Sequence, residues 1–179
     1  MTKHISSPCP VGVAMSGGVD STVAAALLLE QGFAVHGFFM KLPLPGSNEQ
    51  INKVQEVADR LGIPLHFVDM EEDFKERIIT YFCDAYCQGR TPNPCVVCNQ
   101  EIKFGLLIKA MLSQGMKKFA TGHYTGIDRV NGTALLQRGE DPRKDQSYFL
   151  CRLSSQQLQQ TLFPLADRNK KDIFRKAQA

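Results

Sequence analysis

Two cysteines, Cys95 and Cys98, lie in the stretch GRTPNPCVVCNQEIKFG (residues 89–105). The prolines before them predict a loop, and the apolar periodicity from about Gln100 predicts that a helix follows it. A C-x-x-C pair in this setting fits a metal site, a redox couple or a site that handles sulfur. A structural zinc site takes about four ligands, and no second pair with the usual spacing is present. Redox and sulfur chemistry therefore stay open, and both use the thiolate that a helix N-terminus stabilises.

A second stretch, SGGVDST (residues 16–22), has the residue types of a phosphate-binding loop. It comes between a short apolar run, Val11–Met15, and a run of strong helix formers that ends at Gly32. Gly17 and Gly18 permit a tight turn that brings backbone N–H groups to an anion, and the helix dipole points to the same place. The string is neither a Walker loop nor G-x-G-x-x-G. An alternative interpretation of Asp20 and Ser21 is that they cap the helix.

The elements that must position these two stretches alternate between strands and helices. Strands are expected at residues 11–15, 33–40, 64–70 and 117–123, and helices at about 21–31, 47–61, 71–87 and 100–113. Ser47 and Gln50 have the spacing of a capping box. Such alternation predicts an α/β fold, a Rossmann-like doubly wound parallel sheet with helices on both faces. Asn131-Gly132 predicts a hairpin, so we divide the chain into a core (1–124) and an extension of hairpin and helices (125–179).

Composition limits the classes of protein. The chain has 179 residues, of which 43% are hydrophobic, and this is enough for one buried core. The net charge of +3 is compatible with a nucleic-acid partner without requiring one. No apolar run has the length of a signal peptide or a membrane span, so we expect a cytoplasmic protein without membrane contact. In that compartment the six cysteines are expected to be reduced, ligating or catalytic.

The string S-G-G-x-D-S resembles the pyrophosphate loop of the N-type ATP pyrophosphatases, which belong to the adenine-nucleotide α-hydrolase type of fold. The resemblance implies that this chain binds ATP and cleaves it to AMP and pyrophosphate. It also implies that the loop backbone and serines hold the pyrophosphate, and that Asp20 is linked to magnesium. The ATP-binding residues implied at the loop are Ala14, Met15, Ser16, Gly17, Gly18, Val19, Asp20 and Ser21.

Further strings narrow the resemblance. FFMK, GRTPNPCVVCNQEIKFG, ATGHY, DPRKDQSYFL and TLFPLAD stand in this order, and with them the chain resembles the tRNA-specific 2-thiouridylase (MnmA/TrmU) family from Val11 to about Ala177. Enzymes of that family adenylate O2 of the wobble uridine of tRNA and replace this oxygen with sulfur from a cysteine persulfide. The implied partners are tRNA and a sulfur donor or relay protein, and the implied cofactors are ATP and Mg.

Residue roles follow from the same resemblance. Met40 and Gly122 would contact the nucleotide, although a core methionine and an ordinary turn glycine are the alternatives. Cys98 would be the thiol of the sulfur-transfer pair that lies in this segment. The implied tRNA contacts are Asn93, Pro94 and Cys95 at the target base and Lys144, Asp145 and Gln146 around it. A solvated surface is the alternative for the last three, and His123 is given no role.

The chain departs from the family pattern at Cys95, where many members have Asp. The pair Cys95 and Cys98 is therefore also a candidate for ligating a 4Fe-4S cluster, with Cys87 as an extra ligand, or for forming a disulfide. For Cys83 and Cys87, four residues apart on one helix, core packing is the simpler expectation, and we expect Cys151 to be a buried, inert thiol.

A second departure concerns the family's other catalytic cysteine, which lies beyond the TLFPLAD segment and is not in this sequence. We expect the N-terminal domain of a longer enzyme, or a short relative with different chemistry. The alternatives to tRNA thiolation are an ATP-dependent sulfurtransferase or adenylating enzyme with another substrate, and a non-catalytic module that binds a nucleotide or a cluster.

Overall fold

The computed structural model describes residues 8–178 and is built on a five-stranded parallel sheet of order β3-β2-β1-β4-β7. The strands of this sheet are β1 (Pro10–Met15), β2 (Ala34–Lys41), β3 (Leu65–Asp69), β4 (Lys118–Ala120) and β7 (Thr161–Leu162). The strand order reverses between β1 and β4, which makes the carboxyl ends of these two strands the expected ligand site. The doubly wound fold predicted from the alternation of elements is confirmed.

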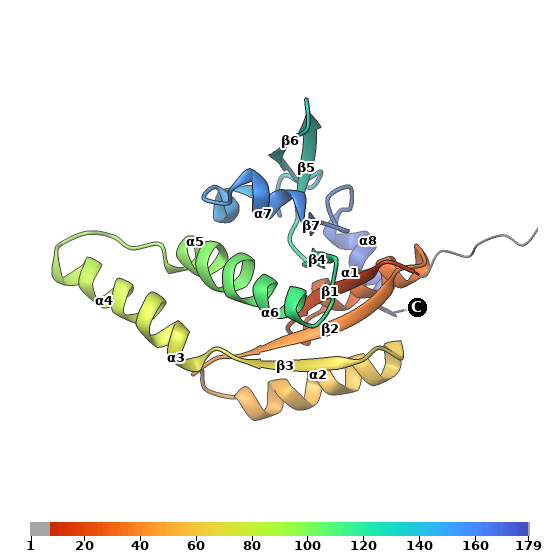
Figure 1. The fold of residues 1–179 in the computed structure, drawn as a ribbon, viewed down its shortest axis with the longest axis horizontal. Helices are drawn as coiled ribbons and strands as arrows, with labels where there is room; N and C mark the ends of the chain where they lie inside the picture. Colours follow the sequence, from red (N-terminus) through yellow and green to blue (C-terminus); the bar gives the residue numbers. More distant parts are fainter. Residues whose placement is uncertain (1–7, 179) are drawn as a thin grey trace, which may run out of the picture.

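Helices cover both faces of this sheet (Figure 1). The helical segments are α1 (Val19–Glu30), α2 (Ser47–Leu61), α3 (Glu71–Phe74), α4 (Thr80–Cys87), α5 (Pro94–Cys98), α6 (Leu107–Ser113), α7 (Ser155–Gln159) and α8 (Lys170–Gln178). The π-helical segment η1 (Lys75–Ile79) joins α3 to α4, η2 (Asn99–Leu106) joins α5 to α6, and η3 (Ser147–Leu150) is a 3₁₀ helix. None of the helices within residues 8–178 has the length and apolar character needed to cross a membrane.

Two apolar clusters hold the helices to the sheet. On one face, Leu28 of α1 and Val54 of α2 are buried with Val13 of β1. On the other face, Ile102 of η2 and Leu107 of α6 are buried with side chains such as Phe38 of β2 and Phe119 of β4. Burying such side chains stabilises the fold by roughly 1.5–3 kcal/mol each. The result is a rigid sheet whose carboxyl edge lies between two helical layers.

Residues after 124 contribute to this framework. β5 (Thr125–Val130) and β6 (Thr133–Arg138) form an antiparallel hairpin closed by Asn131 and Gly132, both with positive φ, as predicted. The hairpin projects away from the sheet in Figure 1. β7, which was not predicted, pairs with β4 and becomes the edge strand. α8 packs on α1 through Ile173, which lies in a buried cluster with Leu27 and Leu165.

Two local predictions are wrong. The cysteine pair is not in a loop, because α5 begins at Pro94, and Asn93 Oδ1 accepts a hydrogen bond from Val96 N (3.3 Å) as the N-cap. Proline at the first helical position lacks an N–H that would be unpaired there in any case, so it starts the helix rather than preventing it. The prediction that Ser47 starts α2 as its N-cap is also wrong, because Gly46 is the N-cap, and Gln50 Nε2 donates to Ser16 O (3.0 Å).

The packing of α8 on α1 gives a test of this part of the fold. Ile173→Ala should lower the free energy of unfolding by about 2–5 kcal/mol, because it leaves a cavity at a residue that is 1% exposed. Arg175→Ala, on the exposed side of the same helix, should change it by less than about 0.5 kcal/mol. Urea denaturation measures both values, and equal stabilities for the two variants would show that α8 is not docked on α1.

Candidate active site

The loop after β1 is folded by its own serines. Ser16 N donates to Ser21 Oγ (3.2 Å), and Ser21 Oγ donates to Gly18 O (3.0 Å). Gly17 has φ of +71°, a conformation that glycine adopts without strain. The N-cap of α1 is Gly18, and no side chain caps this helix, so the capping interpretation of Asp20 and Ser21 is wrong. The loop therefore leaves N–H groups of the first turn of α1 for an anion.

The end of β4 meets this loop through a glycine that has no room for a side chain. A Cβ atom added to Gly122 would lie 2.7 Å from the carbonyl carbon of Asp20 and 2.8 Å from Ser21 N. Both of these atoms belong to backbone, which cannot rotate away as a side chain can. Glycine at 122 thus allows the two carboxyl-end turns at the switch point to touch.

Asp20 is held from two sides by groups far away in the sequence. Tyr124 Oη donates to Asp20 Oδ1 (2.6 Å), and Lys170 Nζ of α8 forms an ion pair with the same oxygen (2.5 Å). Burial and the hydrogen bond to Asp20 raise the pKa of Tyr124, so its hydroxyl stays protonated and remains a donor. Lys170 was not predicted, because nothing in its local sequence links it to a residue 150 positions earlier.

A cavity of about 260 Å³ opens where the loop and the ends of β2 and β4 converge. Seven of the predicted ATP-binding residues line it: Ala14, Met15, Ser16, Asp20, Ser21, Met40 and Gly122. Met15, Ser16 and Met40 also line an adjoining apolar hollow of about 120 Å³, next to Phe39 and Leu42. Of the other predicted residues, Val19 packs against the cluster under α8 and Gly17 faces a groove between α1 and α2.

The cysteine pair lies beside a second cavity, of about 460 Å³. Pro94, Cys95 and Cys98 line it from α5, opposite Phe74 and Phe149. Cys95 is exposed, and Cys98 is half-buried. Burial raises the pKa of the Cys98 thiol, although the nearby Lys103 partly offsets this effect. The thiolate stabilisation expected from a helix start at Gln100 is not found, because the helix begins at Pro94 and Cys98 lies in its second turn.

The predicted tRNA contacts divide into two groups. Pro94, Cys95 and Gln146 line the second cavity. Asn93 is the N-cap of α5 and Lys144 is exposed, and neither of them lines either of the two cavities. Asp145 accepts hydrogen bonds from Gly139 N (3.0 Å) and Ser147 Oγ (2.8 Å), which lower its pKa against the opposing effect of burial. Its carboxylate thus organises the turn before η3.

Three residues form a wall common to both cavities: Lys103, His123 and Gln146. Gln146 is fixed by Tyr124, which donates through its N–H to Gln146 Oε1 (3.0 Å) and accepts from Gln146 N (3.0 Å). His123 lies 2.7 Å from Thr121 Oγ1 through Nδ1, and burial lowers its pKa well below the ordinary value, so the imidazole is neutral at pH 7. The sequence reasoning left His123 without a role and did not single out Lys103.

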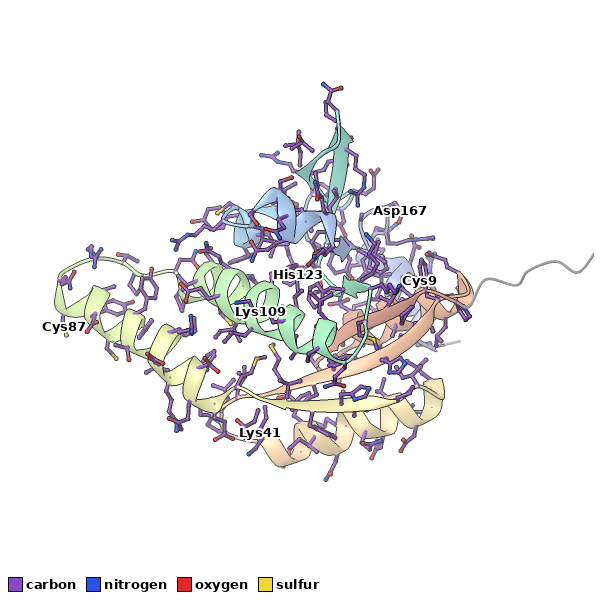
Figure 2. All side chains as sticks on the ribbon, viewed as in Figure 1. Cys9, Lys41, Cys87, Lys109, His123 and Asp167 are labelled. Atoms are coloured by element: carbon purple, nitrogen blue, oxygen red, sulfur yellow. The ribbon has the colours of Figure 1, made fainter. Side chains whose placement is uncertain are left out.

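The three cysteines that were predicted to be buried are exposed in the structure: Cys83, Cys87 and Cys151. Cys87 lies at the far end of α4, well away from His123 at the centre of the molecule (Figure 2). Among residues 8–178, no group of three or more Cys, His, Asp or Glu side chains is arranged to hold a metal ion. Cys87 is therefore not an additional ligand beside Cys95 and Cys98.

Comparison with known folds agrees with this architecture. A subunit described as a predicted subunit of tRNA methyltransferase from Methanocaldococcus jannaschii matches with a TM-score of 0.59 at 17% identity, over 95% of this chain and 74% of that chain. A 4-thiouridine synthetase, solved as an RNA complex with bound ATP, matches with a TM-score of 0.57 at 18% identity, over 95% of this chain and 40% of that chain. At these identities the likeness shows a common fold.

Comparison of sequences is more specific. The tRNA-specific 2-thiouridylase MnmA of Desulfotalea psychrophila is 49% identical over 163 residues, which cover 91% of this chain and 47% of the relative. The chain thus spans about half the length of the curated relatives it matches. The family described as tRNA methyl transferase HUP domain matches residues 9–179. The chain belongs to this family, and the curated relatives that are similar to it are named tRNA-specific 2-thiouridylase MnmA.

Proposed function

We propose that this chain is the ATP-dependent domain of a tRNA 2-thiolating enzyme, in which O2 of the wobble uridine is adenylated and then replaced by sulfur. The observation that carries the proposal is the common wall of Lys103, His123 and Gln146 between a phosphate-loop cavity and a thiol-lined cavity. An adenylated base must be reached by a phosphate donor on one side and a sulfur nucleophile on the other. The naming of the similar relatives supports the same reaction.

ATP would occupy the smaller cavity, with adenine in the apolar hollow at Met40 and the phosphates over Ser16 to Ser21. The loop's fixed N–H groups would stabilise the charge that develops as O2 attacks the α-phosphate and pyrophosphate leaves. Asp20 is the carboxylate that lines this cavity, so it is the residue that would hold Mg²⁺ together with the phosphates. The metal would neutralise phosphate charge and orient the leaving pyrophosphate.

The uridine would enter the larger cavity, whose apolar walls include Phe149. A nucleotide in the anticodon loop is already single-stranded, so extruding it costs little. A persulfide on Cys98 would attack C2 with its terminal sulfur, and AMP would leave with O2. Cys95, three residues earlier on the same helix, could then attack Cys98 Sγ, which breaks the S–S bond to the substrate and leaves a Cys95–Cys98 disulfide.

The cofactor and partner proposals follow from these roles. A 4Fe-4S cluster usually takes four thiolates, whereas the described residues offer two thiols at this cavity and place no group of three or more Cys, His, Asp or Glu side chains to hold a metal ion. The residues of this chain alone therefore do not fit a cluster, and a sulfur donor or relay protein that loads Cys98 is the route that we propose. Because tRNA is the proposed substrate, the proposed compartment is the cytoplasm.

The nucleotide half of the proposal can be tested at Asp20. The parent chain should convert ATP to AMP and pyrophosphate when tRNA and glutathione persulfide are added, and Asp20→Ala should reduce AMP formation by about 100-fold, because the phosphate and metal charge loses its carboxylate partner. Asp167→Ala removes an exposed carboxylate that lines neither of the two cavities and should behave like the parent. Full AMP formation by Asp20→Ala would show that the loop is not the pyrophosphate site.

The thiol half can be tested separately, with glutathione persulfide as the sulfur source. Cys98→Ser should still release pyrophosphate on addition of tRNA but should yield no 2-thiouridine, because adenylation does not use the thiol, whereas AMP leaves only when sulfur attacks C2. Cys87→Ser changes an exposed thiol at the far end of α4 and should yield 2-thiouridine at the parent's rate. Mass spectrometry of tRNA nucleosides measures the product, and thiolation by Cys98→Ser at the parent's rate would contradict the assignment.

A further inference from the structure

Lys103 is the charged residue that lies between the two cavities of the site. It lies in the π-helical segment η2, and its side chain lines both the nucleotide cavity and the thiol cavity. Its two companions on the common wall, Gln146 and His123, carry no charge at pH 7. Among the described residues that line the two cavities, Lys103 is the sole cation, and Asp20 is the sole carboxylate.

The ammonium of Lys103, a half-buried residue, has no partner among the described residues. In the described part of the chain, Nζ forms neither an ion pair nor a hydrogen bond with another residue, whereas Asp20 is already paired with Lys170. Burial lowers the pKa of Lys103, and the thiols of Cys98 and Cys95 partly oppose this effect. Even partial desolvation of a cation without a counter-charge is unfavourable. A site that keeps such a residue is suited to an anion that arrives with the substrates.

The two anions that the reaction brings to these cavities are a nucleotide phosphate and a thiolate or persulfide. Two neighbouring groups change the pKa of Cys98 through their charge: Lys103 lowers it, and the thiol of Cys95 raises it. The same two thiols raise the pKa of Lys103 through their charge. The charge of Lys103 in turn lowers the pKa of His123. Because the side chain of Lys103 lines both cavities, one cation is placed to meet an anion in either of them.

We propose that Lys103 is a catalytic residue that pairs with the phosphate of the bound nucleotide and with the Cys98 sulfur anion, and so draws the two reacting groups together. This inference rests on the proposed function and adds a role to it. During adenylation, the ammonium would offset the negative charge on the α-phosphate. During sulfur transfer, it would stabilise the sulfur anion before attack and the phosphate of AMP as it leaves, with no change in its own protonation.

Lys103→Met keeps the length of the side chain and removes its charge, whereas Lys103→Arg keeps the charge. The control is Lys109→Met, which removes an exposed lysine from the same helical run. Two readouts are taken on each: the dissociation constant for ATP by calorimetry, and the alkylation rate of Cys98 by iodoacetamide as a function of pH, followed by mass spectrometry. Thermal unfolding shows whether each variant is folded, and Lys103→Gln replaces Lys103→Met if the latter is not.

We expect loss of the charge to weaken ATP binding by about 10- to 100-fold, because a charged hydrogen bond to the phosphate would be lost. It should also shift the alkylation profile of Cys98 to higher pH, because the nearby positive charge that favours the thiolate is lost. Lys103→Arg should retain most of the parent's ATP affinity and most of its alkylation profile. Lys109→Met should match the parent in both measurements. A folded, uncharged variant that binds ATP like the parent, or that keeps the parent's alkylation profile, overturns the role of Lys103. A parent chain that binds no ATP overturns the proposed function itself.

Discussion

The contact on which the site depends is the approach of Gly122 to the backbone of Asp20 and Ser21. A Cβ atom at this position would be 2.7 Å from Asp20, so the turn after β4 and the loop after β1 can touch only because residue 122 is glycine. The contact lies at the switch point of the sheet, where β1 and β4 are neighbours and their crossovers run in opposite directions. It places His123 and Tyr124 directly beside the phosphate loop.

The remaining polar groups of the site are arranged around that contact. Tyr124 binds Asp20 through its hydroxyl and Gln146 through its backbone, so one residue orients both the loop and the common wall. Lys170 of α8 pairs with the same Asp20 oxygen that accepts from Tyr124. The C-terminal helix is thereby tied to the nucleotide cavity, and its apolar docking on α1 serves the site as well as the fold.

Local sequence patterns were enough to predict much of the fold and part of the site. The strand, glycine turn and helix at residues 11–31, the parallel sheet and the Asn131-Gly132 hairpin all follow from short-range signals, and the structure has them. The start of α5 was missed because Asn93-Pro94 was interpreted as loop, although asparagine before proline is also a helix start. β7 has only two residues and gives no periodic signal. The site positions of Lys103 and Lys170 could not be predicted, because they depend on contacts between residues far apart in the sequence, which a local pattern does not encode.

The central claim is that uridine O2 is the atom that ATP activates. The most direct measurement uses tRNA whose wobble uridine carries ¹⁸O at O2, incubated with the chain, ATP and sodium sulfide as the nucleophile, with the AMP product analysed by mass spectrometry. If O2 attacks the α-phosphate and leaves when C2 is attacked, each AMP formed in the tRNA-dependent reaction carries one ¹⁸O atom. AMP that forms in the same reaction without ¹⁸O would show that ATP is cleaved by another nucleophile, and it would contradict the account.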